Sequence, residues 1–299
     1  MKSSIIKLLA ISFILLFSLS HAEAQFFGKK GNKKSGSMGE IPQVQLGLKG
    51  GVNLNHLEAT QSYSVITPVD LGSSLTNQKV YDKPYSNMGT QIGLVAAFAI
   101  NNKMVINAEP AFMTLKFGYQ NEYSWSQGED SFVNTEYDFD HALNYLDIPL
   151  TIKYHLTDGP IKPFIQAGGY YAFLTNANKT VNATIEDSAL GGSGDLTTNS
   201  SRLGVNDLFI TSNAGLVGGV GVSIDVGNSP GDMDGSSDLG TVRFTLSVNY
   251  RQGLHNVVDV KNRFKDSALV SGNYDVLDDL RFKNIEVSAG VLFTMKYSK

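Results

Sequence analysis

Apolar and polar residues alternate along Tyr145–Leu156, near the middle of the chain. Every second side chain from Leu146 to Leu156 is apolar, and the positions between them include Asp147 and Lys153. A period of two predicts a β-strand with one apolar face and one polar face. The stretch is about as long as a tilted strand that crosses a bilayer, which needs roughly 9–11 residues. Such a strand fits a soluble sheet with its apolar face inward, or a membrane barrel with its apolar face toward lipid.

Seven further stretches alternate in the same way, and the lengths of the connections choose between the two folds. The eight predicted strands cover 44–54, 90–100, 104–119, 145–156, 162–174, 210–224, 241–253 and 282–297. Long polar connections (55–87, 120–143, 175–206 and 254–281) alternate with shorter turns (101–103, 157–161 and 225–239). Outer-membrane barrels have short periplasmic turns and long extracellular loops. We therefore predict an all-β, eight-stranded antiparallel transmembrane β-barrel rather than a soluble sandwich.

The third predicted strand departs from simple alternation. Its apolar register changes after Phe112, where Met113 and Leu115 become the apolar positions, and Pro110 interrupts it. Proline inside a sheet is typical of an edge or a bulge. The pattern predicts a β-bulge near the outer rim of the barrel.

The N-terminus has the pattern of a secretory signal peptide. Lys2 and Lys7 precede an apolar core at Leu8–Leu19, and a small-x-small cleavage site ends at Ala24. An uncleaved anchor helix is the alternative, but the core is shorter than the ~20 residues that a span needs. We assign 1–24 to the signal peptide, 25–42 to a flexible basic periplasmic linker that could contact anionic lipid, and 43–299 to the barrel.

Composition excludes several classes of protein. The chain has 299 residues, a net charge of −4, 30 Gly, 29 Phe and Tyr together, and no Cys. The net negative charge does not indicate the basic surface that nucleic-acid binding requires. Zero Cys excludes a disulfide scaffold, a Cys-ligated zinc site and a lipidated N-terminal Cys. Glycine and aromatics in short alternating segments favour a β-barrel.

Charged side chains on the predicted inner face are the main chemical feature. An eight-stranded barrel is just wide enough for side chains to fill it, so inner charges must pair. We predict a structural salt-bridge network that fills the lumen, with a gated path for ions or small solutes as the alternative. The predicted network contains Lys49, Glu109, Asp147, Lys153, Arg243, Arg251, Glu286 and Lys296.

Three histidines (His56, His141 and His255) lie near the predicted outer strand ends, and Asp138 and Asp140 flank His141. They could form a metal site or an Asp/His hydrolytic centre at the rim. Scattered loop histidines are the favoured interpretation, because no Ser/His/Asp spacing supports catalysis. We predict no catalytic, cofactor-binding or metal-binding residue.

Two smaller patterns have plain interpretations. The segment 232–235 (DMDG) partly resembles a calcium loop but lacks a third ligand and the distal Glu, so a polar turn is favoured. Trp125 with Phe117, Tyr119 and Tyr123 is typical of an aromatic girdle at the membrane interface.

Several segments occur in an order that identifies a family. LGLKGGVNLNHL, QIGLVAAFAINNKMVINAEPAF, YLDIPLTIKYHL with KPFIQAGGYYAFL, GLVGGVGVSI and FTLSVNYRQGLHNV together resemble the PorT-like outer-membrane β-barrel family over about 44–297. Members of the family it resembles usually carry an acid in the third strand, an acid and a lysine in the fourth, and an arginine with a tyrosine in the seventh. The residues at those places here are Glu109, Asp147, Lys153, Tyr250 and Arg251. The long turn 225–239 and the two residues after the aromatic Tyr297 depart from the pattern.

The resemblance and the pattern together imply an outer-membrane protein of a Gram-negative cell, exported by its signal peptide and then inserted. We expect a non-enzymatic structural, surface-exposed or assembly-partner role without a cofactor; a narrow porin-like channel or, less favoured, a rim hydrolase are the alternatives. Expected partners are outer-membrane lipid and lipopolysaccharide, and a protein bound at the extracellular loops or the linker.

Overall fold

A computed structural model describes residues 44–63, 79–126, 132–188, 196–226, 242–270 and 273–295. The predicted signal peptide and basic linker lie outside these residues, as do 232–235 and Lys296.

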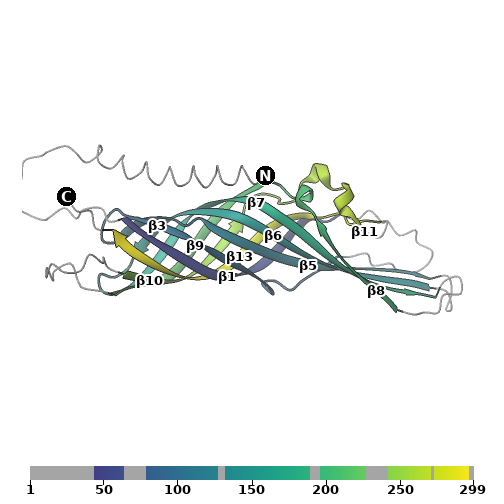
Figure 1. The fold of residues 1–299 in the computed structure, drawn as a ribbon, viewed down its shortest axis with the longest axis horizontal. Coiled ribbons are helices and arrows are strands. Elements are labelled where there is room, and N and C mark those ends of the chain that lie inside the picture. The colour runs from purple at the N-terminus through teal and green to yellow at the C-terminus, as the bar shows by residue number, and fades with distance from the viewer. Residues whose placement is uncertain are drawn as a thin grey trace, which may run out of the picture. The chain divides into compact units, whose positions relative to one another are not determined.

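In the described residues, eight antiparallel strands form a closed ring, and Figure 1 shows these strands from the side. The third consists of two pieces, β4 and β5, which both pair with β3 on one side and β6 on the other. Pairing of β1 with β13 and of β6 with β7 completes the ring. In chain order the strands are β1 Val44–Gln61, β3 Asn87–Ala99, β4 Met104–Ala108 with β5 Ala111–Ser126, β6 Phe132–His155, β7 Ile161–Asp187, β9 Ser212–Val226, β10 Val242–Gly253 and β13 Asp279–Met295. The predicted fold class is confirmed.

Short elements gather at one end of the ring, the end of the long connections. They are β2 Val80–Tyr81, β8 Leu196–Gly204, η2 Asn206–Leu208, η3 Val260–Asn262, η4 Asp266–Ala268, β11 Leu269–Val270 and β12 Asn273–Tyr274. No helix among the described residues has the length and apolar character needed to cross a membrane.

Along one half of the barrel's length, apolar side chains point outward and charged side chains point inward. Leu48 is 62% exposed and Ile92 is 68% exposed, whereas Asp147 and Arg251 are 1% and 2% exposed. This is the reverse of a soluble protein and the arrangement that lipid around a barrel requires. The predicted inversion is confirmed, and this half is the membrane-spanning part.

Beyond the membrane-spanning part the arrangement is the opposite, with apolar side chains inside and charged side chains outside. On β5 and β6 the inward side chains Phe117, Tyr119 and Phe139 are buried, while Lys116 and Asp140 are exposed outside. These side chains pack with η2 and with residues of the cap segment, which we define as 254–270 and 273–280, into one apolar cluster, the extracellular core. Because water surrounds this half, it is packed like a soluble domain.

Two predicted loops are wrong for this reason. Most of 120–143 and 175–206 belongs to strands, namely the extended ends of β5, β6 and β7 together with β8. They form a sheet that projects past the membrane-spanning part (Figure 1). Their outward positions are polar because they meet water, and this polarity made them resemble loops.

The predicted bulge near Phe112 is also wrong. Ala108 pairs with Leu150 and Ala111 pairs with Asp147, so three steps on one strand match three on the other. The carbonyl of Pro110 still accepts a hydrogen bond from the Leu94 amide at 2.9 Å. The strand keeps its phase, and what changes is the medium outside it.

The predicted aromatic girdle is wrong for Phe117 and Tyr119, which are buried in the extracellular core. Tyr123 is partly buried against the same core. The side chain of Trp125 lies outside the described residues.

Candidate functional site

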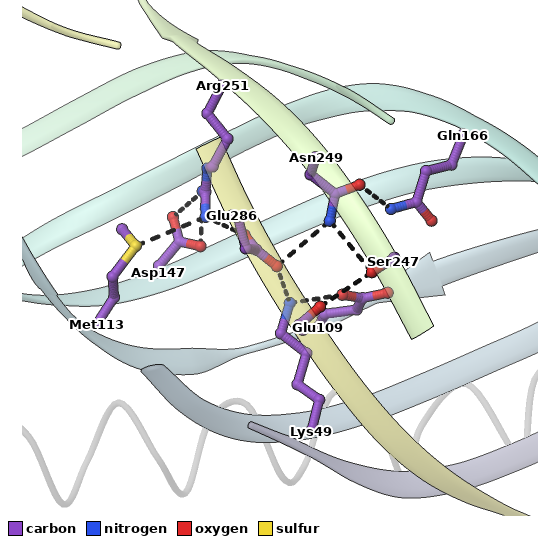
Figure 2. A network of polar contacts seen from close by, with 10 residues as sticks. Lys49, Glu109, Met113, Asp147, Gln166, Ser247, Asn249, Arg251 and Glu286 are labelled. Atoms are coloured by element: carbon purple, nitrogen blue, oxygen red, sulfur yellow. Dashed lines mark hydrogen bonds and ion pairs between the residues drawn. The ribbon is translucent and has the colours of Figure 1, made fainter. Parts of the chain in front are cut away.

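Five charged side chains meet in the lumen, each from a different part of the ring (Figure 2). We call this set the central network: Lys49 from β1, Glu109 from the link between β4 and β5, Asp147 from β6, Arg251 from β10 and Glu286 from β13. Strand alternation places all five inward, because each occupies the face opposite the lipid-facing residues.

Glu286 joins the two cations of the central network. Lys49 Nζ lies 2.7 Å from Glu109 Oε2 and 3.0 Å from Glu286 Oε1. Arg251 Nη1 lies 3.2 Å from Glu286 Oε2. Both oxygens of Glu286 therefore accept a charge-assisted hydrogen bond.

Arg251 is the most constrained member. Its Nη2 donates to both carboxylate oxygens of Asp147, at 2.6 and 2.7 Å, and its guanidinium lies 4.2 Å from the ring centre of Tyr170. The planar fork and the aromatic face suit arginine and not lysine.

Neutral polar groups surround the charges. Asn249 donates to Glu286 Oε1 at 3.3 Å and accepts from Gln166 at 2.5 Å (Figure 2). The hydroxyls of Ser247 and Ser288 are 2.9 Å apart. Since buried ions are stable only when paired and hydrogen-bonded, this shell helps to keep the network in place.

A second charged group lies nearer the periplasmic end. Arg243 contacts Asp225 through Nε at 2.5 Å and Nη2 at 3.0 Å, and Lys162 Nζ lies 2.9 Å from the same carboxylate. Arg243 also donates to Gln45 at 3.1 Å. This group is separate from the central network in the contacts of the described residues.

The structure thus unites five of the eight predicted lumen residues. Arg243 belongs to the second group, Lys153 forms no ion pair within the described residues, and Lys296 lies outside them. Sequence reasoning missed Asp225 and Lys162. Asp225 falls one residue past the predicted strand end and Lys162 at a predicted strand start, where inward alternation could have found both.

The extracellular core contains buried charges that the sequence did not indicate. The hydroxyl of Tyr119 donates to Asp275 at 2.7 Å, and Lys179 Nζ lies 3.1 Å from Asp275. Tyr81 and Lys79 contact Asp278 in the same way, at 2.6 and 2.9 Å. Burial, with the nearby Asp275 carboxylate, raises the pKa of Tyr119 well above its usual range. These contacts attach the cap segment to β2, β5 and β7 and to Lys79.

The structure does not assemble the three histidines into a site. His141 is buried and stacks on Phe117 with ring centres 4.5 Å apart, while Asp138 and Asp140 lie on the other face of β6. Burial first, and then Lys179 and Lys79, lower the pKa of His141 well below its usual value. His56 instead lies beside Tyr85, and no group of three His, Cys, Asp or Glu in the described chain could hold a metal ion.

Solved structures share only a weak likeness with this chain. Ail, the attachment invasion locus protein of Yersinia pestis, is 10% identical with a TM-score of 0.28, and the match covers 83% of this chain and 98% of Ail. Neisserial surface protein A is 13% identical with a TM-score of 0.28, covering 85% and 99%. Scores this low establish no shared function. No curated protein matches.

A family model provides the assignment. The model described as "Outer membrane protein beta-barrel domain" matches residues 29–259, more than half of the chain. The match agrees with the closed ring, the lipid-facing apolar band and the charged lumen. The chain belongs to the outer membrane protein beta-barrel domain family, and it is located in the outer membrane.

Proposed function

We propose that this protein is a non-enzymatic, PorT-like barrel of a Gram-negative outer membrane that presents a folded extracellular surface to a protein partner. It is exported by the signal peptide at 1–24 and inserted through residues 43–299. Outer-membrane lipid, including lipopolysaccharide, surrounds its apolar band. Its mechanism is presentation and assembly rather than transport or catalysis.

The observation that carries this proposal is that the interior is filled at two levels. The central network occupies the membrane-spanning lumen, and Arg251 is among the largest fully buried side chains. The extracellular core occupies the mouth, where Leu208, Val257 and Leu280 are buried. A continuous water path would have to disrupt both.

The outer part has the features of a presenting surface. The strands β5, β6 and β7 continue far beyond the lipid-facing band, and β8 is exposed along nearly its whole length. Because these strands are held by ladder hydrogen bonds, the surface is rigid. A rigid surface loses little conformational entropy when a partner binds.

Planar-bilayer recording tests the closed lumen. We expect the wild-type protein to show no discrete single-channel steps, and the Arg251→Ala variant to begin to show them because it opens the central network. Arg281→Ala replaces an exposed, outward-facing side chain of β13 and is the matched control. Regular wild-type conductance steps that change with Lys153→Gln would instead favour the narrow channel.

Co-purification from native membranes tests the partner role. We expect a companion protein that is retained with the wild-type barrel and lost from a double variant in β8, Thr198→Arg with Ser200→Arg. The matched control is Lys103→Gln at the opposite, periplasmic end. A wild-type protein that purifies alone, or a companion indifferent to β8, contradicts an assembly role at this surface.

A further inference from the structure

The charges that point into the membrane-spanning lumen do not balance. Within the described residues they are five cations and four carboxylates: Lys49, Lys153, Lys162, Arg243 and Arg251 against Glu109, Asp147, Asp225 and Glu286. However these groups are divided into pairs, one positive charge has no carboxylate of its own. An uncompensated charge away from bulk water is costly.

Lys153 is the cation that lacks a contact. It is 7% exposed, its Nζ lies 4.2 Å from the ring centre of Phe164, and no carboxylate of the described chain lies within ion-pair distance of it. The carboxylates to either side are occupied. Glu109 contacts Lys49 at 2.7 Å, and Asp225 contacts Arg243 at 2.5 Å.

Polar groups without hydrogen-bond partners lie on both sides of Lys153 along β6, and a further one lies on β9. Thr151 and His155 are its inward-facing neighbours on β6, two residues to either side. The hydroxyl of Thr151, both ring nitrogens of His155 and the hydroxyl of Ser223 are buried and have no partner in the described part of the chain. All three side chains are at least nine-tenths buried. Buried polar atoms without partners also occur elsewhere in the lumen, but Thr151 and His155 flank a cation that has no carboxylate partner among the described residues. Ser223 is one inward position along β9 from Gly221, against which the Phe164 ring under Lys153 lies.

The second charged group lies between the surroundings of Lys153 and the periplasmic end of the lumen. Ser223 pairs in register with Lys162, and Asp225 pairs with Arg243 at the ends of β9 and β10. The side chains of Lys162, Asp225 and Arg243 are 21%, 17% and 12% exposed. Exposure therefore falls from the periplasmic end of the lumen inward to Lys153. An anion entering from the periplasm would pass two cations before it reaches a third.

We propose that the periplasmic end of the lumen binds one small anionic group, a carboxylate or a phosphate, on Lys153 with Thr151, His155 and Ser223 as hydrogen-bond donors. A carboxylate, or phosphate in its monoanionic form, adds one negative charge to the four carboxylates and so balances the five cations. Short charge-assisted hydrogen bonds to an anion would satisfy the orphaned donors together. This inference concerns the periplasmic end and does not depend on the partner at the extracellular surface.

Amide NMR on the folded, full mature protein in detergent micelles tests the site with acetate and with inorganic phosphate, and with chloride at matched ionic strength. We expect saturable shifts at residues 151–155 and 223 with acetate or phosphate, and not with chloride. The acetate and phosphate arms show which of the two chemistries the site takes. Lys153→Met should abolish the saturable shifts. Lys103→Met, at a lysine in a nearby turn whose side chain is 41% exposed, should leave them unchanged.

Ser223→Ala provides a second variant if Lys153→Met does not fold. Loss of one hydrogen bond to a charged ligand should weaken binding by roughly tenfold. Shifts that rise linearly with concentration, shifts of equal size with chloride, or saturation that persists unchanged in Lys153→Met or Ser223→Ala would overturn the proposal.

Discussion

Arg251 on β10 and Asp147 on β6 are joined across the lumen, with Arg251 Nη2 at 2.6 and 2.7 Å from the two carboxylate oxygens. The two strands are not neighbours, since β7 and β9 lie between them in the ring. The contact therefore ties opposite walls of the barrel together. Both groups are buried, and each charge would be strongly destabilising without the other.

Removing one side of this pair should destabilise the barrel strongly. Arg251→Met leaves Asp147 and one oxygen of Glu286 without their cation, and breaking a buried pair in this way costs about 3–5 kcal/mol. Urea unfolding in micelles measures the change in free energy. Arg281→Met, on an exposed side chain of β13, is the control and should change stability by no more than about 0.5 kcal/mol. Equal effects of the two substitutions would contradict the role of the network.

A charge on the lipid-facing surface should be costly only within the apolar band. Leu246 and Leu196 are both exposed, at 52% and 69%, but Leu246 lies on β10 in the band and Leu196 on β8 beyond it. In vesicles we expect Leu246→Lys to cost about 2–4 kcal/mol of folding free energy, as lysine does near the bilayer midplane. Leu196→Lys should cost about 0.5 kcal/mol or less. Matching costs would mean that the two surfaces face the same medium.

His141 should make stability depend on pH. Burial, Lys179 and Lys79 depress its pKa in the folded protein, whereas in the unfolded chain the side chain binds a proton below pH ~6.5. Because the unfolded state then binds more protons, the free energy of unfolding should decrease as pH falls below ~6.5, by up to about 1.4 kcal/mol per pH unit. Unfolding curves between pH 8 and 5 measure this slope.

His141→Phe is the matched variant for that experiment. It keeps an aromatic ring stacked on Phe117 and removes the titrating group. Its slope between pH 7 and 5 should be smaller than that of the wild-type protein. The same slope in both proteins would show that His141 is not the group responsible.

Asp275 should hold the cap segment in place. Asp275→Asn removes the charge that Lys179 contacts and leaves that lysine buried. We expect hydrogen exchange in the cap segment to accelerate, while exchange in β1 and β13 stays slow. Asp266→Asn, an exposed change in the same segment, should leave exchange unchanged. Slow exchange throughout the cap in Asp275→Asn would show that the apolar contacts suffice.

Alternation made the membrane-spanning part predictable. A period of two fixes which side chains share a face, so Leu150 and Asp147 could be assigned to opposite faces without coordinates. The same rule placed the five members of the central network inside. Their pairing could not be predicted, because Arg251 and Asp147 are far apart in sequence and on strands that are not neighbours.

The extracellular half could not be predicted because the same alternation has the opposite meaning there. Phe117 and His141 point inward, where the membrane-spanning part has polar side chains, because water and not lipid lies outside. The sequence does not show where the medium changes. Asp275 was missed for a related reason: its partners Tyr119 and Lys179 lie on distant strands, and nothing around it in the cap segment indicates burial.

Site-directed spin labelling along β10 tests the central claim most directly, and the chain has no native Cys to interfere. Single cysteines at positions 244–250 would be labelled in protein reconstituted into vesicles, and collisions with oxygen and with a water-soluble nickel complex compared. We predict that labels at 244, 246 and 248 collide with oxygen and are protected from nickel, while those at 245, 247 and 249 are shielded from both. Nickel access at the even positions, or no alternation, would contradict a barrel whose apolar face meets hydrocarbon.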